Sequence, residues 1–442
     1  MSGLPEEDWR ALRARQQPDR EGPDELETVL AWLEEAPQLV YTAECDRLKD
    51  RLAAVARGEA VILHGGDGAE TFARADADAV RGNLKTLLQM AVVLTYAASV
   101  PVIKVGRTAG QYAGPRTPSG QRGGRPLSSC RGGAVDVPAF TARARRREPW
   151  RMRRMYECSA MTLNLLRAFT TGGFADLRQL HDWNRGFVAS SAAGRRYEEL
   201  VDEIGRGLAF MRACGVTGHE LAAAEFFVGH EGLLLDYEAA LTRTDPESGR
   251  TYATSGHLLW IGDGARDPGG AHVEFLSRVS NPLAVALGPS ATPATAVRLV
   301  DRLDPQREPG RLTFVVRAGA DRIRDLLPGL VETVRSEGAQ VCWVSDPMHG
   351  NTFTAATGHR TLTFETALDE VRGFMQVHRS LGTHPGGIHA ELTGEDVTEC
   401  VGGGNGVLPE DLPRRYVTAR APRFNHAQSL ELAFLLAEMY CE

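Results

Sequence analysis

The stretch VCWVSDPMHGNT, residues 341–352, joins a short apolar run to a polar cluster. Residues 341–344 have the length and composition of a strand that is buried on both faces. Asp346 and His349 follow directly, and the carboxyl ends of parallel strands are where α/β enzymes carry their chemistry. This pair fits a metal ligand, an acid/base pair or a hydrogen-bonded loop histidine. The pair alone does not decide among these roles.

The same pattern, an apolar run that ends in glycine or a charged residue, recurs along the chain. We predict seven more strands, at residues 60–64, 102–105, 222–228, 258–261, 283–287, 312–316 and 388–391. We predict helices at residues 24–35, 45–56, 78–99, 156–169, 197–214, 295–303, 320–337, 364–381 and 427–440. Eight strands that alternate with helices predict an α/β fold, the (β/α)8 TIM barrel. A doubly wound sheet is less favoured, because no glycine-rich dinucleotide fingerprint follows the first strand.

The remaining segments are interpreted as additions to this barrel. Residues 1–56 are expected to form an N-terminal arm and helices, with a short helix around residues 9–15. Residues 57–442 would form the barrel, with a basic and helical insertion at about residues 120–215. The dense arginine run at 143–154 is interpreted as a solvated face. The long Gly-, Pro- and Arg-rich loop at 108–125 is typical of functional or disordered segments.

Composition excludes several classes of protein. The 442 residues carry a net charge of −7, which argues against a general nucleic-acid binder. The 7 cysteines form no CxxC pair, so neither a zinc ribbon nor a disulfide scaffold is indicated. The polar N-terminus resembles no signal peptide, and no apolar run approaches the roughly 20 residues that a membrane span needs. We expect a cytoplasmic protein with neither nucleic-acid nor membrane partners, and a homodimer or higher homo-oligomer.

On a barrel, the residues that follow the strands gather at one rim. On this prediction the rim collects Asp67, Arg107, Glu225, His230, Asp263, Arg317, His349 and Glu391. Four arginines could bind phosphate or carboxylate, namely Arg107, Arg116, Arg266 and Arg317. His349 and Glu391 could ligate a metal or move protons. The combination indicates an enzyme with an anionic small-molecule substrate, and a rim of ordinary ion pairs is the alternative.

Several long motifs carry a resemblance to a known family. They are VGRTAGQYAGPRTP (105–118), TLNLLRAFTTGG (162–173), LLLDYEAALTR (233–243), GAHVEFLSRVSNP (270–282), DPMHGNT (346–352), GTHPGGIHAELTGEDVTECVGG (382–403) and QSLELAFLLAEM (428–439). From about Leu26 to its end the chain resembles the class II 3-deoxy-D-arabino-heptulosonate 7-phosphate (DAHP) synthases, the plant and actinobacterial type. The resemblance agrees with the predicted barrel.

The resemblance implies a reaction and roles for particular residues. The family condenses phosphoenolpyruvate with erythrose 4-phosphate, and a divalent metal such as Mn²⁺ or Co²⁺ activates the aldehyde. His349 and Glu391 would be metal ligands. Arg107 and Arg317 would contact phosphoenolpyruvate, Trp260 would line the site, and Arg116 would lie near the aldose phosphate.

The chain also departs from the family's motifs. At the metal site, the family's GGDCAE and DPRLN lose a cysteine and an aspartate, which are Gly68 and Ala421 here. At the substrate site, GERTR has Asp263 and Gly264 in place of Glu and Arg, while IKVGP and AKPRS have Ala286 and Gly114 in place of lysines. The family's YRGD is CRGG at 130–133. A site left with one histidine and one carboxylate should bind a divalent ion much more weakly.

These departures lead to the hypothesis of a repurposed enzyme. It would act on a different, less phosphorylated anionic molecule, in natural-product biosynthesis, by metal-independent acid/base chemistry. We therefore expect no metal cofactor. His349, Glu391 and Asp346 would be catalytic, with Arg317 as anchor and His349 as proton shuttle, and Asp263 and Arg266 would help to bind substrate. Two alternatives are a non-catalytic partner of a true synthase and an ordinary DAHP synthase.

Overall fold

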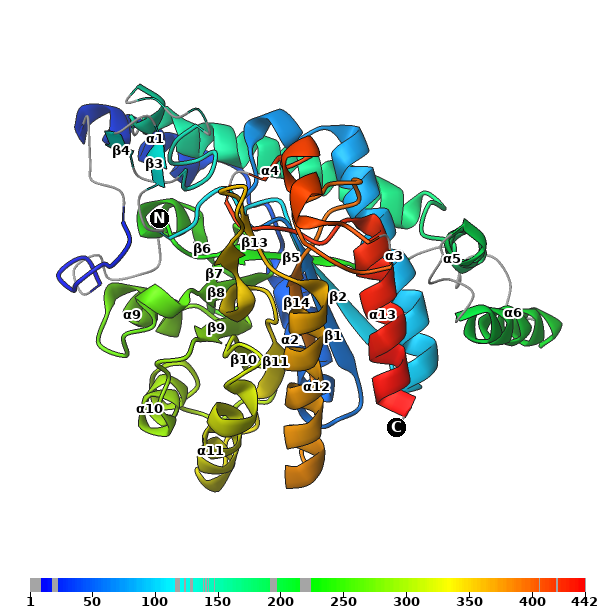
Figure 1. The fold of residues 1–442 in the computed structure, drawn as a ribbon. Helices are drawn as coiled ribbons and strands as arrows, with labels where there is room; N and C mark the ends of the chain where they lie inside the picture. The colour runs from blue at the N-terminus through cyan, green and yellow to red at the C-terminus, as the bar shows by residue number, and fades with distance from the viewer. Residues whose placement is uncertain are drawn as a thin grey trace.

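The predicted TIM barrel is present. The computed structural model describes residues 9–17, 23–115, 120–122, 125–127, 130–137, 139, 141, 143–146, 148–190, 197–214, 224–404, 406–418 and 420–441. Among these residues, eight parallel strands close in the order β1-β14-β11-β10-β9-β8-β5-β2 (Figure 1). The barrel strands are β1 (Val61–Gly66), β2 (Val102–Arg107), β5 (Phe227–Glu231), β8 (Leu258–Ile261), β9 (Leu283–Leu287), β10 (Leu312–Val316), β11 (Cys342–Ser345) and β14 (Gly387–Glu391).

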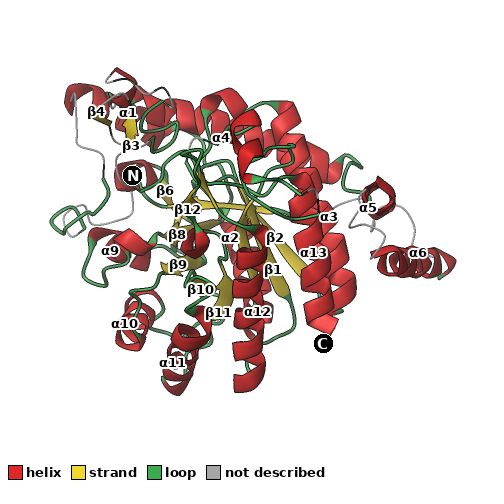
Figure 2. Ribbon diagram, in the orientation of Figure 1, coloured by secondary structure: helices red, strands yellow, loops and turns green. Residues whose placement is uncertain are grey.

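Helices lie outside the strands (Figure 2). Before the barrel come α1 (Pro23–Glu35) and α2 (Thr42–Ala56). The later helices are α3 (Ala77–Ala98), α4 (Trp150–Thr171), α5 (Leu177–Ser190), α6 (Glu198–Ala213), α8 (Leu235–Ala240), α9 (Ala271–Ser277), α10 (Pro293–Leu303), α11 (Ile323–Ser336), α12 (Phe364–Leu381) and α13 (His426–Cys441). The last of these, α13, packs along α3 and so closes the ring of helices (Figure 1).

Short elements decorate the loops. The hairpins are β3 (Gly120–Arg122) with β4 (Arg125–Leu127), β6 (Thr242–Thr244) with β7 (Thr251–Ala253), and β12 (Phe353–Thr354) with β13 (Arg360–Thr361). Single 3-10 turns are η1 (Phe72–Arg74), η2 (Arg143–Arg145), η4 (Asp263–Ala265), η5 (His349–Asn351) and η6 (Pro409–Arg414). Among the described residues, no helix is long and apolar enough to span a bilayer.

Strand side chains alternate between the barrel interior and the helix layer. Outward residues such as Leu63, Leu259 and Val285 join the cluster that packs against the surrounding helices. Inward residues such as Ile62 and Val344 form a separate cluster inside the barrel. Both faces of each strand are therefore buried, which explains why the strands appear in the sequence as continuous apolar runs.

The interior cluster includes three residues of α2, which lies before the first strand. Leu48, Leu52 and Val55 pack against the inward strand residues, and the thiol of Cys342 donates to the carbonyl of Leu52. This helix therefore fills the amino-terminal end of the barrel. The expectation that the first 55 or so residues decorate the barrel is wrong for α2, because its apolar face forms part of the core.

Four other predictions are also wrong, at least in part. The third barrel strand begins at Phe227, so Glu225 precedes it and pairs with Arg51 of α2 rather than joining the rim. The helix predicted at 156–169 begins at Trp150 and takes in part of the arginine run. There Arg151 is buried and donates to the carbonyl of Gly133, so the run is not wholly a solvated face. Residues 9–15 form turns, where a short helix was predicted.

The role of α2 as part of the core can be tested by stability. Leu52 is fully buried in the interior cluster, so Leu52→Ala should lower the free energy of unfolding by about 2–5 kcal/mol, as lost burial and a cavity add. Leu408→Ala, at an exposed site, is the matched control and should change it by less than about 0.5 kcal/mol. Chemical denaturation of both variants measures this, and equal small effects would show that α2 is a peripheral helix.

Candidate functional site

Polar side chains fill the carboxyl-terminal end of the barrel interior, above the apolar cluster. The inward positions of the strands and of the residues that follow them are His64, Arg107, Glu231, Trp260, Arg317, Asp346, His389 and Glu391. Most of these continue the alternation of an apolar inward residue lower on the same strand, whereas His389 and Glu391 lie above Gly387 on β14. The site is therefore the upper part of the same interior that α2 closes from below.

Arg107 and Glu391 meet across β1. In the sheet register both are neighbours of Gly66, one on each side. Arg107 Nη2 lies 3.1 Å from Glu391 Oε1, and both side chains are buried. A Cβ at Gly66 would lie 2.7 Å from the carbonyl oxygen of Arg107, and the residue has a φ of +145°. Glycine is thus required where β1 passes between the two charged strand ends.

His349 lies between two carboxylates. Its Nδ1 is 2.8 Å from Asp346 Oδ2, and its Nε2 is 3.3 Å from Glu391 Oε1. Asp346 also pairs with Arg317, whose Nε lies 3.4 Å from Oδ2. The five groups form one row of alternating charge, from Arg107 through Glu391, His349 and Asp346 to Arg317.

The pKa values follow from this row. Burial opposes ionisation of Glu391, but the charges of His349 and Arg107 outweigh it and lower its pKa to about 2. Burial likewise opposes ionisation of Asp346, yet His349 and Arg317 hold its pKa well below the ordinary value. Burial would lower the pKa of His349, but Asp346 and Glu391 raise it above the ordinary value. The row therefore favours a protonated His349 between two ionised carboxylates.

Below the row lie two histidines that the sequence analysis missed, and Trp260, which the resemblance placed in the lining of the site. Arg107 Nη1 bonds to His389 Nε2, and His389 Nδ1 lies 2.8 Å from His64 Nδ1. The guanidinium of Arg107 stacks over Trp260 at 5.1 Å from the ring centroid. Burial, with Arg107 beside them, lowers the pKa of both histidines well below the ordinary value. Side chains two residues apart on a strand point the same way, so His389, two residues before Glu391, and His64, two residues before Gly66, could have been identified from the sequence.

A carboxylate on α12 holds two of the site loops. Glu370 Oε1 accepts from the backbone N–H groups of Ala318 and Gly319, directly after Arg317. Its Oε2 accepts from Asn351 Nδ2, two residues beyond His349. Glu370 is buried and was missed from the sequence, because its position inside a helix pattern resembles any other polar residue there.

Other predicted residues lie elsewhere. Asp263 accepts from Arg266 Nε at 2.7 Å and from the backbone N–H of Gly288, so these two form a separate pair between β8 and β9. His230 points outward and lies 2.9 Å from a buried carboxylate of Glu238 on α8. Arg116 lies outside the described residues.

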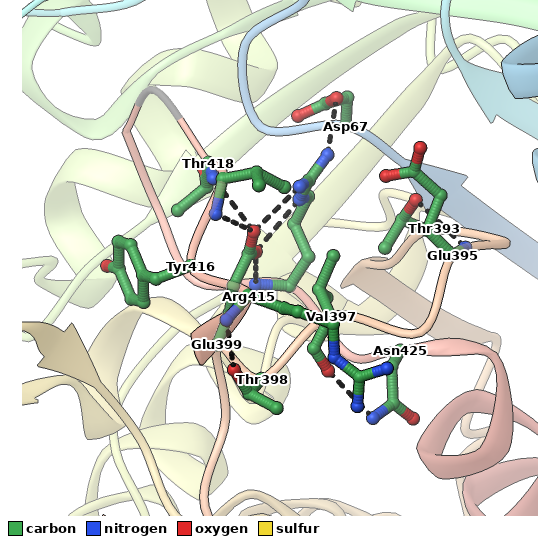
Figure 3. A network of polar contacts seen from close by, with 12 residues as sticks. Asp67, Thr393, Glu395, Val397, Thr398, Glu399, Arg415, Tyr416, Thr418 and Asn425 are labelled. Atoms are coloured by element: carbon green, nitrogen blue, oxygen red, sulfur yellow. Dashed lines mark hydrogen bonds and ion pairs between the residues drawn. The ribbon is translucent and has the colours of Figure 1, made fainter. Parts of the chain in front are cut away.

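Asp67, directly after β1, joins a buried network with residues of the segment between β14 and α13. Arg423 Nη1 donates to Asp67 Oδ2 at 2.9 Å, and its Nε and Nη2 donate to Glu399 at 2.9 and 2.7 Å. Glu399 also accepts from the backbone of Thr418 at 2.8 Å, and Figure 3 shows Asp67 and Thr418 on opposite sides of this network. The segment between β14 and α13 is therefore fastened to the end of β1.

The donors available to a metal ion are few. His349 and Glu391 face one another, and a Cβ at Gly68 would lie 2.6 Å from Glu391 Oε1, so the carboxylate fills the volume of the missing side chain. Asp67 is engaged by Arg423, and Ala421 is buried but has no donor. Among the described residues, no group of three or more His, Cys, Asp or Glu side chains is arranged to hold an ion.

Comparison with known proteins gives consistent matches. A sequence profile of the Class-II DAHP synthetase family matches residues 4–437. The chain is 58% identical over 433 residues to the phospho-2-dehydro-3-deoxyheptonate aldolase of Streptomyces coelicolor, which covers 98% of this chain and 96% of that protein. It is 50% identical over 434 residues to phospho-2-dehydro-3-deoxyheptonate aldolase AroG of Mycolicibacterium smegmatis, covering 97% and 93%.

A solved structure gives a weaker match. The phospho-2-dehydro-3-deoxyheptonate aldolase from Francisella tularensis is 10% identical and has a TM-score of 0.46, over 96% of this chain and 98% of that one. At this score the likeness adds no argument. The fold therefore rests on the strand order of the chain itself.

The contact made by Glu370 predicts a pH effect on stability. Burial raises its pKa to about 7, so the stability that this group contributes is full below pH 4.5 and is lost as the pH rises through 7. Glu370→Gln cannot ionise, so its stability relative to the parent should increase from pH 5 to pH 8 by about 1–3 kcal/mol. Thermal unfolding across this range measures the slope. Asp369→Asn, an exposed neighbour on the same helix, should keep the parent's slope, and an unchanged slope in Glu370→Gln would contradict the assignment.

Proposed function

This chain belongs to the class-II DAHP synthetase family, and we propose that it catalyses the family's condensation of phosphoenolpyruvate with erythrose 4-phosphate. One observation carries the proposal. At 58% identity, the likeness to the Streptomyces coelicolor aldolase extends over 98% of this chain and 96% of that protein. The chain is an enzyme of the DAHP synthase type, and the ordinary synthase was the last of the alternatives drawn from the sequence.

The hypothesis of a repurposed enzyme is wrong. Nearly full-length identity of 58% and 50% to two phospho-2-dehydro-3-deoxyheptonate aldolases contradicts a different, less phosphorylated substrate, and nothing supports a place in natural-product biosynthesis. The hypothesis counted each departure from the family motifs as a lost contact. At Gly68 the structure has a charged side chain, that of Glu391, in the vacated volume.

The expectation of no metal cofactor is also wrong. The family uses a divalent metal, so membership makes one expected. His349 and Glu391 are the positions that the resemblance assigns to it. Because the described side chains supply only this pair of donors, they do not complete an ion site by themselves.

The row of alternating charge supports a role in binding the substrates. Phosphoenolpyruvate carries a phosphate and a carboxylate, and the guanidinium groups of Arg107 and Arg317 stay protonated and can bind either bidentately. Asp346 holds His349 through Nδ1, and Nε2 faces Glu391 on the side of the row toward Arg107. There Nε2 and the Glu391 carboxylate would help to hold the divalent ion, which would supply the Lewis acid that polarises the aldehyde.

Two finer expectations stay predictions. These are the homodimer or higher homo-oligomer and the cytoplasmic location. Family membership is compatible with both, and neither is needed for the proposed reaction.

The proposed reaction predicts a direct assay. The purified chain with Mn²⁺ should release phosphate only when both phosphoenolpyruvate and erythrose 4-phosphate are present. His349→Ala should lower kcat by at least about 10²-fold, because a metal that acts as a Lewis acid contributes several kcal/mol to the transition state. Arg317→Ala should raise the KM of phosphoenolpyruvate by about 10–100-fold, the worth of a charge-assisted hydrogen bond. Arg324→Ala, on the exposed face of α11, is the control. Absence of two-substrate phosphate release from the parent would refute the proposal.

Family membership also predicts metal dependence. Dialysis against a chelator should abolish the condensation, and added Mn²⁺ should restore it. Electron paramagnetic resonance of free Mn²⁺ should show weaker binding to Glu391→Gln than to the parent, because a carboxylate donor is lost. Full turnover by a parent that elemental analysis shows to be metal-free would contradict this expectation.

A further inference from the structure

Arg420 occupies the volume that a side chain at position 114 would fill. An ideal Cβ on Gly114 would lie 1.4 Å from Arg420 Nη1 and 2.5 Å from its Cζ. Gly114 is not among the described glycines with positive φ, so its backbone would accept a side chain. Glycine is therefore needed here because of Arg420, and not because of the local backbone conformation.

The surroundings of Arg420 are those of the site. Gly114, whose side-chain volume Arg420 fills, follows Ala113, and Gln111 links the carbonyl of Ala113 to the backbone N–H of Glu231. Burial lowers the pKa of Arg420, the charges of Glu231 and Glu391 raise it, and those of Arg107 and Arg360 lower it further. Nη1 is buried and has no hydrogen-bond partner among the described residues. One oxygen of Glu231 and one of Glu391 are likewise buried and unpartnered within the described part of the chain. A buried charged donor without a partner is costly and calls for an explanation.

The position of Arg420 is fixed from both sides along the chain. Its backbone N–H donates to the hydroxyl of Thr418, and Thr418 donates to Glu399. Three residues further on, Arg423 is held by Glu399 and Asp67 within the network of Figure 3. Arg420 is therefore held by its own backbone bond to Thr418 and lies close in sequence to the buried Arg423.

We propose that Arg420 binds a phosphate or carboxylate group of a substrate, reaching the site through the volume left by Gly114. A bound anion would give Nη1 the hydrogen-bond partner that it lacks and would offset the repulsion between the guanidinium groups of Arg420 and Arg107. Arginine suits this role because its guanidinium remains charged when buried and offers two parallel donors to a tetrahedral or planar anion. The inference rests on the proposed function, since it assigns one more contact to the same anionic substrates.

The test combines kinetics with a binding measurement that needs no turnover. Arg420→Ala should raise the KM of phosphoenolpyruvate or of erythrose 4-phosphate by about 10–100-fold. The substrate whose KM moves identifies the bound group. Quenching of Trp260 fluorescence should show the same loss of affinity if phosphoenolpyruvate or inorganic phosphate is bound. Arg420→Lys should recover part of the loss, and Arg414→Ala, exposed on the same segment, should behave as the parent.

A double-mutant cycle tests whether Arg420 depends on the side-chain volume that Gly114 leaves open. Gly114→Ala should displace the guanidinium and weaken substrate binding in the same direction as Arg420→Ala. The double variant should be no worse than Arg420→Ala alone, since the displaced group is already absent. The variant Gly114→Lys combined with Arg420→Ala places a lysine cation in the volume that the guanidinium of Arg420 occupied. It should restore part of the substrate affinity.

The outcomes separate this inference from the proposed function. If the parent lacks condensation activity but binds phosphoenolpyruvate or phosphate, with loss in Arg420→Ala, the proposed function fails and the role of Arg420 stands. If Arg420→Ala keeps both KM values and both affinities within about twofold, the inference is wrong, as it is if the parent binds neither probe. Should Arg420→Ala not fold, as judged by circular dichroism, Arg420→Lys and Gly114→Ala carry the same comparison.

Discussion

Opposite charges buried inside a barrel must neutralise one another, and here they do so in a row. Arg107 and Glu391 meet across a strand that has glycine at their level, and His349, Asp346 and Arg317 continue the alternation of sign. Each charge is stabilised by its neighbours, so removing one member leaves the next unpaired in a region with little water. The strand order, the glycine of β1 and the loops after β10 and β11 are all required to bring these five groups together.

The sequence was sufficient for the fold because buried parallel strands are continuous apolar runs, as at 258–261 and 283–287, where the predicted bounds match the structure. It failed at β5, where alanines before Phe227 resembled a strand start. For the site, alternation along each strand could have added His64, Glu231 and His389. It could not have added Glu370 or Arg420, because each reaches the site from a helix or loop distant in sequence, and only tertiary packing reveals such contacts.

The departures from the family motifs show how a missing side chain can mislead. Gly68 and Gly114 were interpreted as lost contacts, yet the carboxylate of Glu391 and the guanidinium of Arg420 lie within the volumes that side chains at these positions would occupy. Interiors are close-packed, so a vacated volume is filled by the nearest group that can reach it. Judging function from single positions overlooks these neighbours, whereas identity over the whole chain includes them.

The position of α2 has a consequence for the order of folding. Its apolar residues Leu48, Leu52 and Val55 leave the ribosome before any strand, but their partners extend along the chain as far as Val344 on β11. During synthesis this face can contact β1 early, but its native packing is incomplete until β11, the seventh of the eight barrel strands, exists. Contacts of such long sequence separation close late, because the loop entropy must be overcome first. We infer that α2, which is made before any strand, completes its docking late, and that part of its apolar face stays exposed until then.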